Sequence, residues 1–197
     1  FLVDEFFHEH LPSFDAVVLQ DFDAQPYGLE RHLPALASYV KNGGGLVMVG
    51  GPNSFVAGGY AGTPLAEVLP IELDGSRGSA AADMGAFVPA WTETGEHAPL
   101  LAPLRGIVGS ELPTMHGSNV LGAPTKGATA LWAHADRKDG KGRPMPVLAI
   151  GERGNGRSIA LAVDGTWQLE FSSIGAGTSG RGSLRSLHKK AIFSCSG

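Results

Sequence analysis

The chain has 197 residues, including 29 glycines and 13 prolines, and a formal net charge of -4 at pH 7. This length is sufficient for a hydrophobic core, and the glycine and proline content favours long loops without reaching the level of low-complexity chains. Because 15 basic residues stand against 19 acidic ones, the chain lacks the positive surface that nucleic-acid binding needs. The single cysteine excludes an internal disulfide and a multi-thiolate metal site.

The first half of the chain predicts a parallel βαβ unit. Residues 16–19 form a short apolar, β-branched run, which is typical of a buried strand. Residues 45–50 form a second such run. Between them lies a helical apolar pattern that ends at a run of glycines. This pattern consists of Leu29, Leu33, Leu36, Tyr39 and Val40. Because the connections are short, we expect the two strands to be adjacent and parallel.

The second half predicts antiparallel structure. Three short strand candidates occur, at residues 86–91, 128–133 and 146–150. Residues 153–157 contain an Asn-Gly pair that predicts a β-hairpin turn, and the Gly/Ser/Ala stretch at 75–86 predicts an exposed loop. Residues 183–195 predict a terminal helix that packs on the sheet. Its apolar positions are Leu184, Leu187, Ala191, Ile192 and Cys195.

The Gly-rich loop after the second strand, residues 50–60, is the most distinctive segment. Its glycines allow backbone N–H groups to approach a ligand closely, and open α/β sheets bind ligands at the carboxyl ends of their strands. A helix expected to open at Thr63 would direct its positive end to the same crevice. We therefore predict a ligand-binding site there. Its residues would be Asp21, Asp23, Gly50, Gly51, Asn53, Ser54 and Tyr60.

A competing interpretation gives these residues only structural roles. Asp21 and Asp23 would cap turns, Asn53 and Ser54 would satisfy the backbone of their own loop, and Tyr60 would fill the core beneath it. The sequence leaves both interpretations open.

A catalytic alternative is a hydrolase in which Ser54 attacks the substrate. His97 or His116 would then be the base, and Asp21 or Asp23 would orient it. The sequence contains neither the G-x-S-x-G elbow nor its cysteine counterpart. We therefore favour a binding domain over this hydrolase.

Other motifs give weak signals. Residues 175–180 spell G-x-G-x-x-G but lack the following strand and acidic residue of a dinucleotide site. His8 and His10 have the spacing of two ligands on a strand face, without a third ligand nearby. Cys195 lies on an apolar helical side, as a structural thiol would. We expect no metal and no cofactor, and no apolar run approaches the roughly 18 residues that span a bilayer.

A longer block of sequence carries a family resemblance. Residues 39–55 read Tyr-Val-Lys-Asn-Gly-Gly-Gly-Leu-Val-Met-Val-Gly-Gly-Pro-Asn-Ser-Phe, and residues 58–65 and Leu69-Pro70 continue the pattern. This block resembles the glutamine amidotransferase-like domains of bacteria, which belong to the class I glutamine amidotransferase-like superfamily. Such domains often occur in large membrane-anchored proteins beside von Willebrand factor A domains. Looser similarity follows at residues 95–100, 146–149, 154–157 and 164–167.

The resemblance implies an α/β fold, namely a flavodoxin-like three-layer sandwich with a mainly parallel sheet, here with antiparallel additions in the second half. It implies that residues 1–197 form a single domain that lacks the first βα unit of its relatives. It also implies a soluble domain of a bacterial membrane-anchored protein, with no membrane insertion by this segment and with a small molecule or protein partner within a larger assembly.

The resemblance does not extend to the catalytic residues. Enzymes of the superfamily carry a cysteine on the elbow and a His-x-Glu pair near the end. Here the elbow region, residues 50–54, reads Gly-Gly-Pro-Asn-Ser, and no His-x-Glu occurs. We therefore expect the fold without glutaminase activity.

Overall fold

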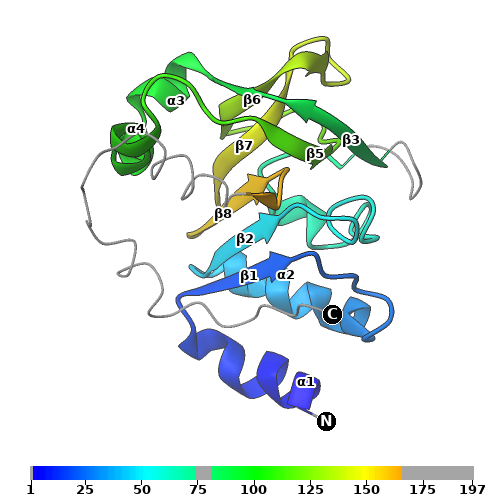
Figure 1. Ribbon diagram of the computed structural model, residues 1–197. Helices are drawn as coiled ribbons and strands as arrows, with labels where there is room; N and C mark the ends of the chain where they lie inside the picture. The colour runs from blue at the N-terminus through cyan, green and yellow to red at the C-terminus, as the bar shows by residue number, and fades with distance from the viewer. Residues whose placement is uncertain (1, 74–80, 166–197) are drawn as a thin grey trace.

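The computed structural model describes residues 2–73 and 81–165, and its main feature is a six-stranded sheet in the order β1-β2-β8-β7-β6-β4 (Figure 1). The parallel strands are β1 (Ala16–Gln20), β2 (Gly45–Val49) and β8 (Gly156–Leu161). The antiparallel strands that continue the sheet are β7 (Pro144–Arg153), β6 (Ala128–Lys138) and β4 (Pro89–Trp91). A separate two-stranded sheet pairs β3 (Ala82–Phe87) with β5 (Met115–Asn119).

The helices are short and either precede β1 or lie between the strands. Before β1 come α1 (Leu2–Glu5), the π-helical turn η1 (Phe6–His10) and the 3-10 turn η2 (Leu11–Ser13). Between β1 and β2 are η3 (Leu29–His32) and α2 (Leu33–Lys41), and η4 (Ala66–Val68) follows β2. Between β4 and β5 are α3 (Glu93–His97), η6 (Pro99–Leu101) and α4 (Ala102–Val108). Among the described residues, none of these helices has the length and apolar character needed to cross a bilayer.

The predicted βαβ unit is confirmed. β1 and β2 pair in parallel, with Val17 opposite Leu46, and α2 connects them. Leu33, Leu36 and Val40 of α2 are buried in the core. The α/β class with a flavodoxin-like arrangement and antiparallel additions in the second half is therefore also confirmed.

One face of the parallel strands is fully buried beneath α2. A Cβ added to Gly156 of β8 would lie 2.0 Å from the carbonyl oxygen of Val40, so α2 crosses this strand at the closest distance that glycine allows. Along each strand, side chains alternate between this buried face and the opposite face. The side chains of the buried face are Val17, Leu19, Leu46, Met48, Ser158 and Ala160.

The predicted hairpin between β7 and β8 is confirmed. Arg153 pairs with Gly156, and Gly154 occupies the turn with φ +63°, a conformation that favours glycine. The hairpin places β8 beside β2, which brings the second half of the chain onto the parallel unit.

Two expectations for the second half are wrong. The strand predicted at residues 86–91 is divided, because β3 ends at Phe87 and β4 begins at Pro89 in a different sheet. A proline lacks the N–H for a ladder and is tolerated at the start of an edge strand. The exposed loop predicted at residues 75–86 ends at β3, whose pairing with β5 outweighs its weak local strand propensity. The terminal helix at 183–195, the motif at 175–180 and Cys195 lie outside the described residues.

Candidate functional site

The carboxyl ends of β1 and β2 meet at one edge of the sheet, where Asp21 contacts the Gly-rich loop. Asp21 has φ +46°, which aspartate adopts more readily than most residues. Its Oδ1 accepts a hydrogen bond of 2.8 Å from the backbone N–H of Asn53. Its carboxylate also lies over Gly51, where a Cβ would meet an oxygen at 2.4 Å. The structure thus brings together Asp21, Gly51 and Asn53, as the sequence predicted.

The loop begins with a close passage beside β8. The N–H of Gly50 donates to the carbonyl oxygen of Leu161 at 2.7 Å. A Cβ at Gly50 would lie 2.4 Å from the carbonyl oxygen of Ala162. Only glycine fits there, so the start of the loop is fixed against the end of β8.

Asn119, at the end of β5, holds the loop from the other side and is 2% exposed. Its Oδ1 accepts from the N–H of Gly51 at 2.9 Å, and its Nδ2 donates to the carbonyl oxygens of Gly51 at 3.0 Å and Ser54 at 3.5 Å. Its own N–H donates to the carbonyl oxygen of Ala162 at 2.8 Å. Sequence reasoning missed this residue, because nothing in a short strand far along the chain indicates a contact with residues 50–60.

Ser54 and Tyr60 point into the protein rather than to solvent, since each is 1% exposed. The hydroxyl of Ser54 donates to the carbonyl oxygen of Val49 at 2.6 Å, and that of Tyr60 donates to the carbonyl oxygen of Phe22 at 2.8 Å. Between them, Phe55 is fully buried with φ +53°. These contacts stabilise the shape of the loop.

Many of the N–H groups of the loop are already used within the protein. Besides Gly51 and Asn53, four further donors have carbonyl partners in the loop itself, the first being Ser54 to Gly51 at 3.2 Å. The others are Gly58 to Ser54 at 3.0 Å, Gly59 to Val56 at 3.1 Å and Tyr60 to Phe55 at 3.1 Å. These donors are therefore taken, and the exposed side chains of the loop tip are Pro52 and Asn53.

The remaining expectations for this edge concern Asp23 and the helix at Thr63. The Oδ1 of Asp23 accepts from the N–H of Gln25 at 2.9 Å, as an aspartate in a turn does. The prediction of a helix that begins at Thr63 is wrong, because the only helical element in that segment is the three-residue 3-10 turn η4 (Ala66–Val68). The hydroxyl of Thr63 donates to the carbonyl oxygen of Tyr60 at 2.7 Å instead of capping a helix.

The family can be assigned from a match over most of the chain. A model of the family described as "Putative glutamine amidotransferase" matches residues 6–172. The chain belongs to this amidotransferase family. None of the curated proteins matches it significantly.

Solved structures share the fold of this amidotransferase-like chain. The cytoplasmic protein STM1381 of Salmonella typhimurium LT2 has 24% identity and a TM-score of 0.66, with 84% of this chain and 70% of that chain covered. The cytoplasmic protein STM3548 of Salmonella typhimurium has 24% identity and a TM-score of 0.59, with 82% and 63% covered. A ThuA-like protein of Bacteroides uniformis has 14% identity and a TM-score of 0.52, with 87% and 71% covered. This chain thus spans less than two thirds of STM3548, and these identities show the fold alone.

In this amidotransferase-like domain, the residues of the hydrolase alternative lie on separate elements. His97 ends α3, which packs on β6. β8 and β7 separate β6 from β2, a distance of about 14 Å at the usual strand spacing. His116 lies on β5, roughly 10 Å along the strand from Asn119. Among the described residues, the hydroxyl of Ser54 contacts the carbonyl of Val49 and neither histidine.

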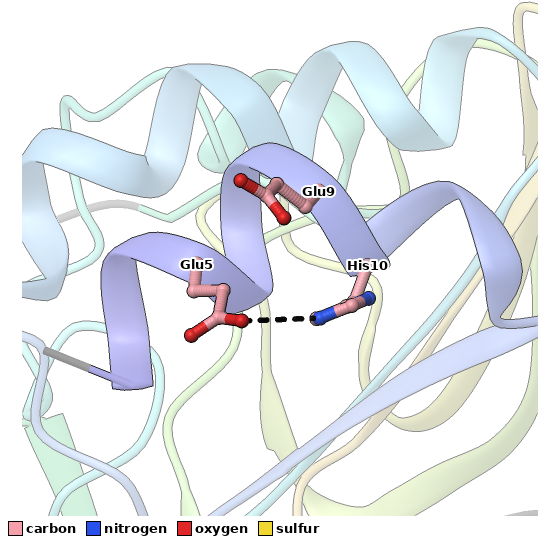
Figure 2. Close-up of side chains that lie close together, drawn as sticks. All are labelled: Glu5, Glu9 and His10. Atoms are coloured by element: carbon pink, nitrogen blue, oxygen red, sulfur yellow. Dashed lines mark ion pairs between the residues drawn. The ribbon is translucent and has the colours of Figure 1, made fainter.

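Possible metal ligands gather elsewhere in this amidotransferase-like chain, near its N-terminus (Figure 2). Ligand atoms of Glu5, Glu9 and His10 lie within 4.8 Å of one another, and Nε2 of His10 is 3.7 Å from Oε1 of Glu5. All three residues are exposed. The sequence suggested ligands two positions apart, which project from the same side only in a strand. This segment is helical instead. We assign no metal site to it.

Proposed function

We propose that this amidotransferase-like domain binds a small ligand or a protein partner through the loop of residues 50–60, without glutaminase activity. The observation that carries the proposal is the environment of Ser54, which is 1% exposed and whose hydroxyl donates a hydrogen bond to the carbonyl oxygen of Val49. The loop that follows β2 therefore presents no accessible nucleophile. Its exposed side chains are instead Pro52 and Asn53, and the partly exposed carboxylate of Asp21 lies beside them.

The fixed shape of the loop supports a role in binding. Asp21 holds it at the end of β1, and Asn119 holds it at the end of β5. A surface that is ordered before it binds pays less conformational entropy on association than a mobile one. Rigidity of this kind favours recognition at the edge where α/β proteins commonly bind ligands.

The polar groups at this edge favour a ligand that donates hydrogen bonds. The donors of Gly51, Gly58 and Gly59 are used within the protein, so an anion would lack them as partners. The carboxylate of Asp21 and the exposed amide of Asn53 supply acceptor oxygens. A ligand with ammonium, amide or hydroxyl donors matches these groups.

The absence of glutaminase activity is tested by incubating the 197-residue chain with glutamine and measuring ammonia. We expect no release above the buffer rate. Ammonia release by the wild-type chain that is lost in Cys195→Ala would overturn the proposal, because it would show a thiol-dependent glutaminase.

Binding is tested by amide chemical-shift titration with ethanolamine as a cationic, donor-rich probe and with inorganic phosphate. We expect saturable shifts at residues 21 and 53 with ethanolamine only. Asn53→Ala should weaken this binding while leaving the melting temperature unchanged, since its side chain is exposed. Absence of saturable shifts with ethanolamine, or equal shifts with phosphate, would contradict the proposed chemistry.

A further inference from the structure

A cavity of about 540 Å³ lies at the amino ends of β1 and β2, at the opposite edge of the sheet from the loop of residues 50–60. Its walls come from η1 and η2, from the residues that enter β1, and from α2 with the turn that follows it. Because β1 extends about 17 Å from end to end, this cavity is separate from the polar groups around Asp21. Its volume lies within the range of roughly 300 to 1,000 Å³ that small-molecule sites occupy.

The cavity has an ordered aromatic wall formed by Tyr39 of α2. The ring of Tyr39 lies directly on the backbone of the turn after α2, because a Cβ added to Gly44 would overlap its Cζ atom. Its hydroxyl donates a hydrogen bond of 2.8 Å to the carbonyl oxygen of Phe14. These two contacts fix the ring between α2 and the start of β1. A ligand that packs on it therefore loses little conformational entropy from the protein.

Two further aromatic residues, Phe7 and Phe14, line the same cavity. Phe6 connects them, since its ring lies edge-on to that of Phe7 at 5.0 Å and tilted against that of Phe14 at 5.3 Å between centroids. The ring of Phe7 also stacks on the buried His32 at 4.8 Å. Phe7 belongs to η1, and π-helical turns of this kind are rare and occur frequently at functional sites.

The polar side chains of the cavity carry one formal charge. Besides the phenol of Tyr39, they belong to Asp15, Ser38 and Asn42, which are all exposed. The lining residues, all within the described part of the chain, include no Lys, Arg or His. The cavity thus combines aromatic walls with a single carboxylate, a composition that favours a cation over an anion.

The pKa of Tyr39 shows that this carboxylate lies near the aromatic wall. Burial raises the pKa of the phenol above its ordinary value, the backbone N–H of Gly45 partly opposes this effect, and the negative charge of Asp15 adds to it. The phenol is therefore neutral at physiological pH and keeps its proton for Phe14. The charge of the cavity is that of Asp15.

We propose that this cavity binds a small aromatic ligand that carries an ammonium group. The aromatic body packs against the rings of Phe7, Phe14 and Tyr39, because aromatic groups favour offset and edge-to-face neighbours. The ammonium group pairs with Asp15, whose carboxylate has about four acceptor positions and binds a ligand beside its partners within the protein. The exposed hydroxyl of Ser38 and amide of Asn42 supply further acceptors at the opening.

Three probes separate the contributions of ring and charge in amide chemical-shift titrations of the 197-residue chain. Phenethylamine has both groups, phenylpropionate has the same ring with an anion, and ethanolamine has the ammonium group without a ring. We expect saturable shifts at residues 14, 15 and 38–44 with phenethylamine. At these residues the other two probes should bind at least about tenfold more weakly.

Three results of these titrations would overturn the proposal. The first is the absence of saturable shifts with phenethylamine at residues 14, 15 and 38–44. The second is equal affinity there for either of the other probes, because the ring or the charge would then contribute nothing. The third is a set of phenethylamine shifts confined to residues 21 and 53, which would place the ligand at the opposite edge of the sheet.

The role of the carboxylate is tested with Asp15→Asn, which keeps the size of the side chain and removes its charge. This variant should bind phenethylamine about tenfold more weakly and phenylpropionate no more weakly than the wild type does. Asp136→Asn is the matched control, because Asp136 is an exposed aspartate on β6 that does not line the cavity. Equal affinities of the two variants for phenethylamine would contradict the assignment of Asp15.

The location is tested by filling the cavity. Ser38→Phe places a ring there from an exposed position of α2 and should lower the affinity for phenethylamine at least about tenfold. Lys41→Phe is the matched control, because Lys41 is exposed on the same helix and does not line the cavity. Wild-type affinity in a folded Ser38→Phe would overturn the proposal. If Ser38→Phe lowers the melting temperature strongly, the comparison of Asp15→Asn with Asp136→Asn decides.

Discussion

The carboxylate of Asp21 accepts a hydrogen bond from the backbone N–H of Asn53, 32 positions further along the chain, at 2.8 Å. Asp21 follows β1, whereas Asn53 lies in the loop that follows β2. The contact therefore joins the ends of two adjacent parallel strands. Because Asn119 binds the same loop from β5, the conformation of residues 50–60 depends on two side chains outside the loop.

The first prediction concerns Asp21. Asp21→Ala should destabilise the fold by about 1 to 3 kcal/mol in urea denaturation, because it removes a charge-assisted hydrogen bond and places alanine at φ +46°. Asp21→Asn retains an acceptor oxygen and tolerates this φ, so it should cost less. Asp23→Ala, which removes only a local turn contact, should stay within about 0.5 kcal/mol of wild type. Equal losses in Asp21→Ala and Asp23→Ala would contradict this account.

The second prediction concerns Asn119. Asn119→Ala should cost about 2 to 3 kcal/mol, because it removes the acceptor of the Gly51 N–H and one donor to the Gly51 carbonyl, which then keeps only the N–H of Ser54. Asn53→Ala is the matched control, since this exposed side chain should contribute less than about 0.5 kcal/mol. Urea midpoints of the two variants give the comparison. A cost for Asn119→Ala as small as that of Asn53→Ala would show that water replaces the amide.

The sequence predicts the parallel unit well, because its signals are local. The apolar runs at β1 and β2 and the pattern of α2 each lie within a few residues, and short connections leave little choice of topology. The division at Pro89 and the pairing of β3 with β5 depend on partners far along the chain. Local patterns carry no information about such partners.

The sequence predicted that Asp21, Gly51 and Asn53 lie together at this edge of the sheet, but not which of the polar groups there are already hydrogen-bonded within the protein. Strand order places Asp21 and Asn53 at one edge, as any parallel unit would. The glycines suggested backbone donors open to a ligand, yet the N–H groups of Gly58 and Gly59 donate to carbonyl oxygens within the loop. Asn119 was unpredictable, because it reaches the loop only through the tertiary fold.

The third prediction concerns the contact between α2 and β8. Gly156→Ala should destabilise the protein by about 2 kcal/mol or more, because the new Cβ would lie 2.0 Å from the carbonyl oxygen of Val40 and neither backbone can move freely. Gly106→Ala, in α4, is the matched control. No atom lies within 4 Å of its added Cβ, so alanine should stabilise the helix by about 0.5 to 1 kcal/mol. Melting curves of both variants test the opposite signs.

The last prediction concerns the pH dependence of stability through His134. This residue is 5% exposed, its ring stacks on Phe87 with centroids 4.1 Å apart, and its Nδ1 accepts the N–H groups of Asp136 and Arg137 at 3.2 and 3.1 Å. Burial lowers the pKa of His134, and the nearby Asp136 only partly offsets this effect. The folded state therefore favours the neutral ring.

The sign of the pH effect follows from that direction. The unfolded chain protonates this histidine near its ordinary pKa of about 6.5, whereas the folded chain resists protonation to lower pH. The contribution of neutral His134 to stability is complete above about pH 6.5 and is lost as the pH falls through the lower pKa of the folded state. Protonation would also place a proton on Nδ1, which accepts two backbone donors.

Unfolding free energies measured in urea between pH 7.5 and about pH 5 test this effect. His134→Gln keeps a side-chain acceptor and cannot titrate, so it should lose less stability over this range than the wild type does. His97→Gln removes an exposed histidine and should retain the wild-type dependence. If His134→Gln and the wild type lose stability in parallel, the buried ring is not the group that senses acidification, and other titrating groups account for the change.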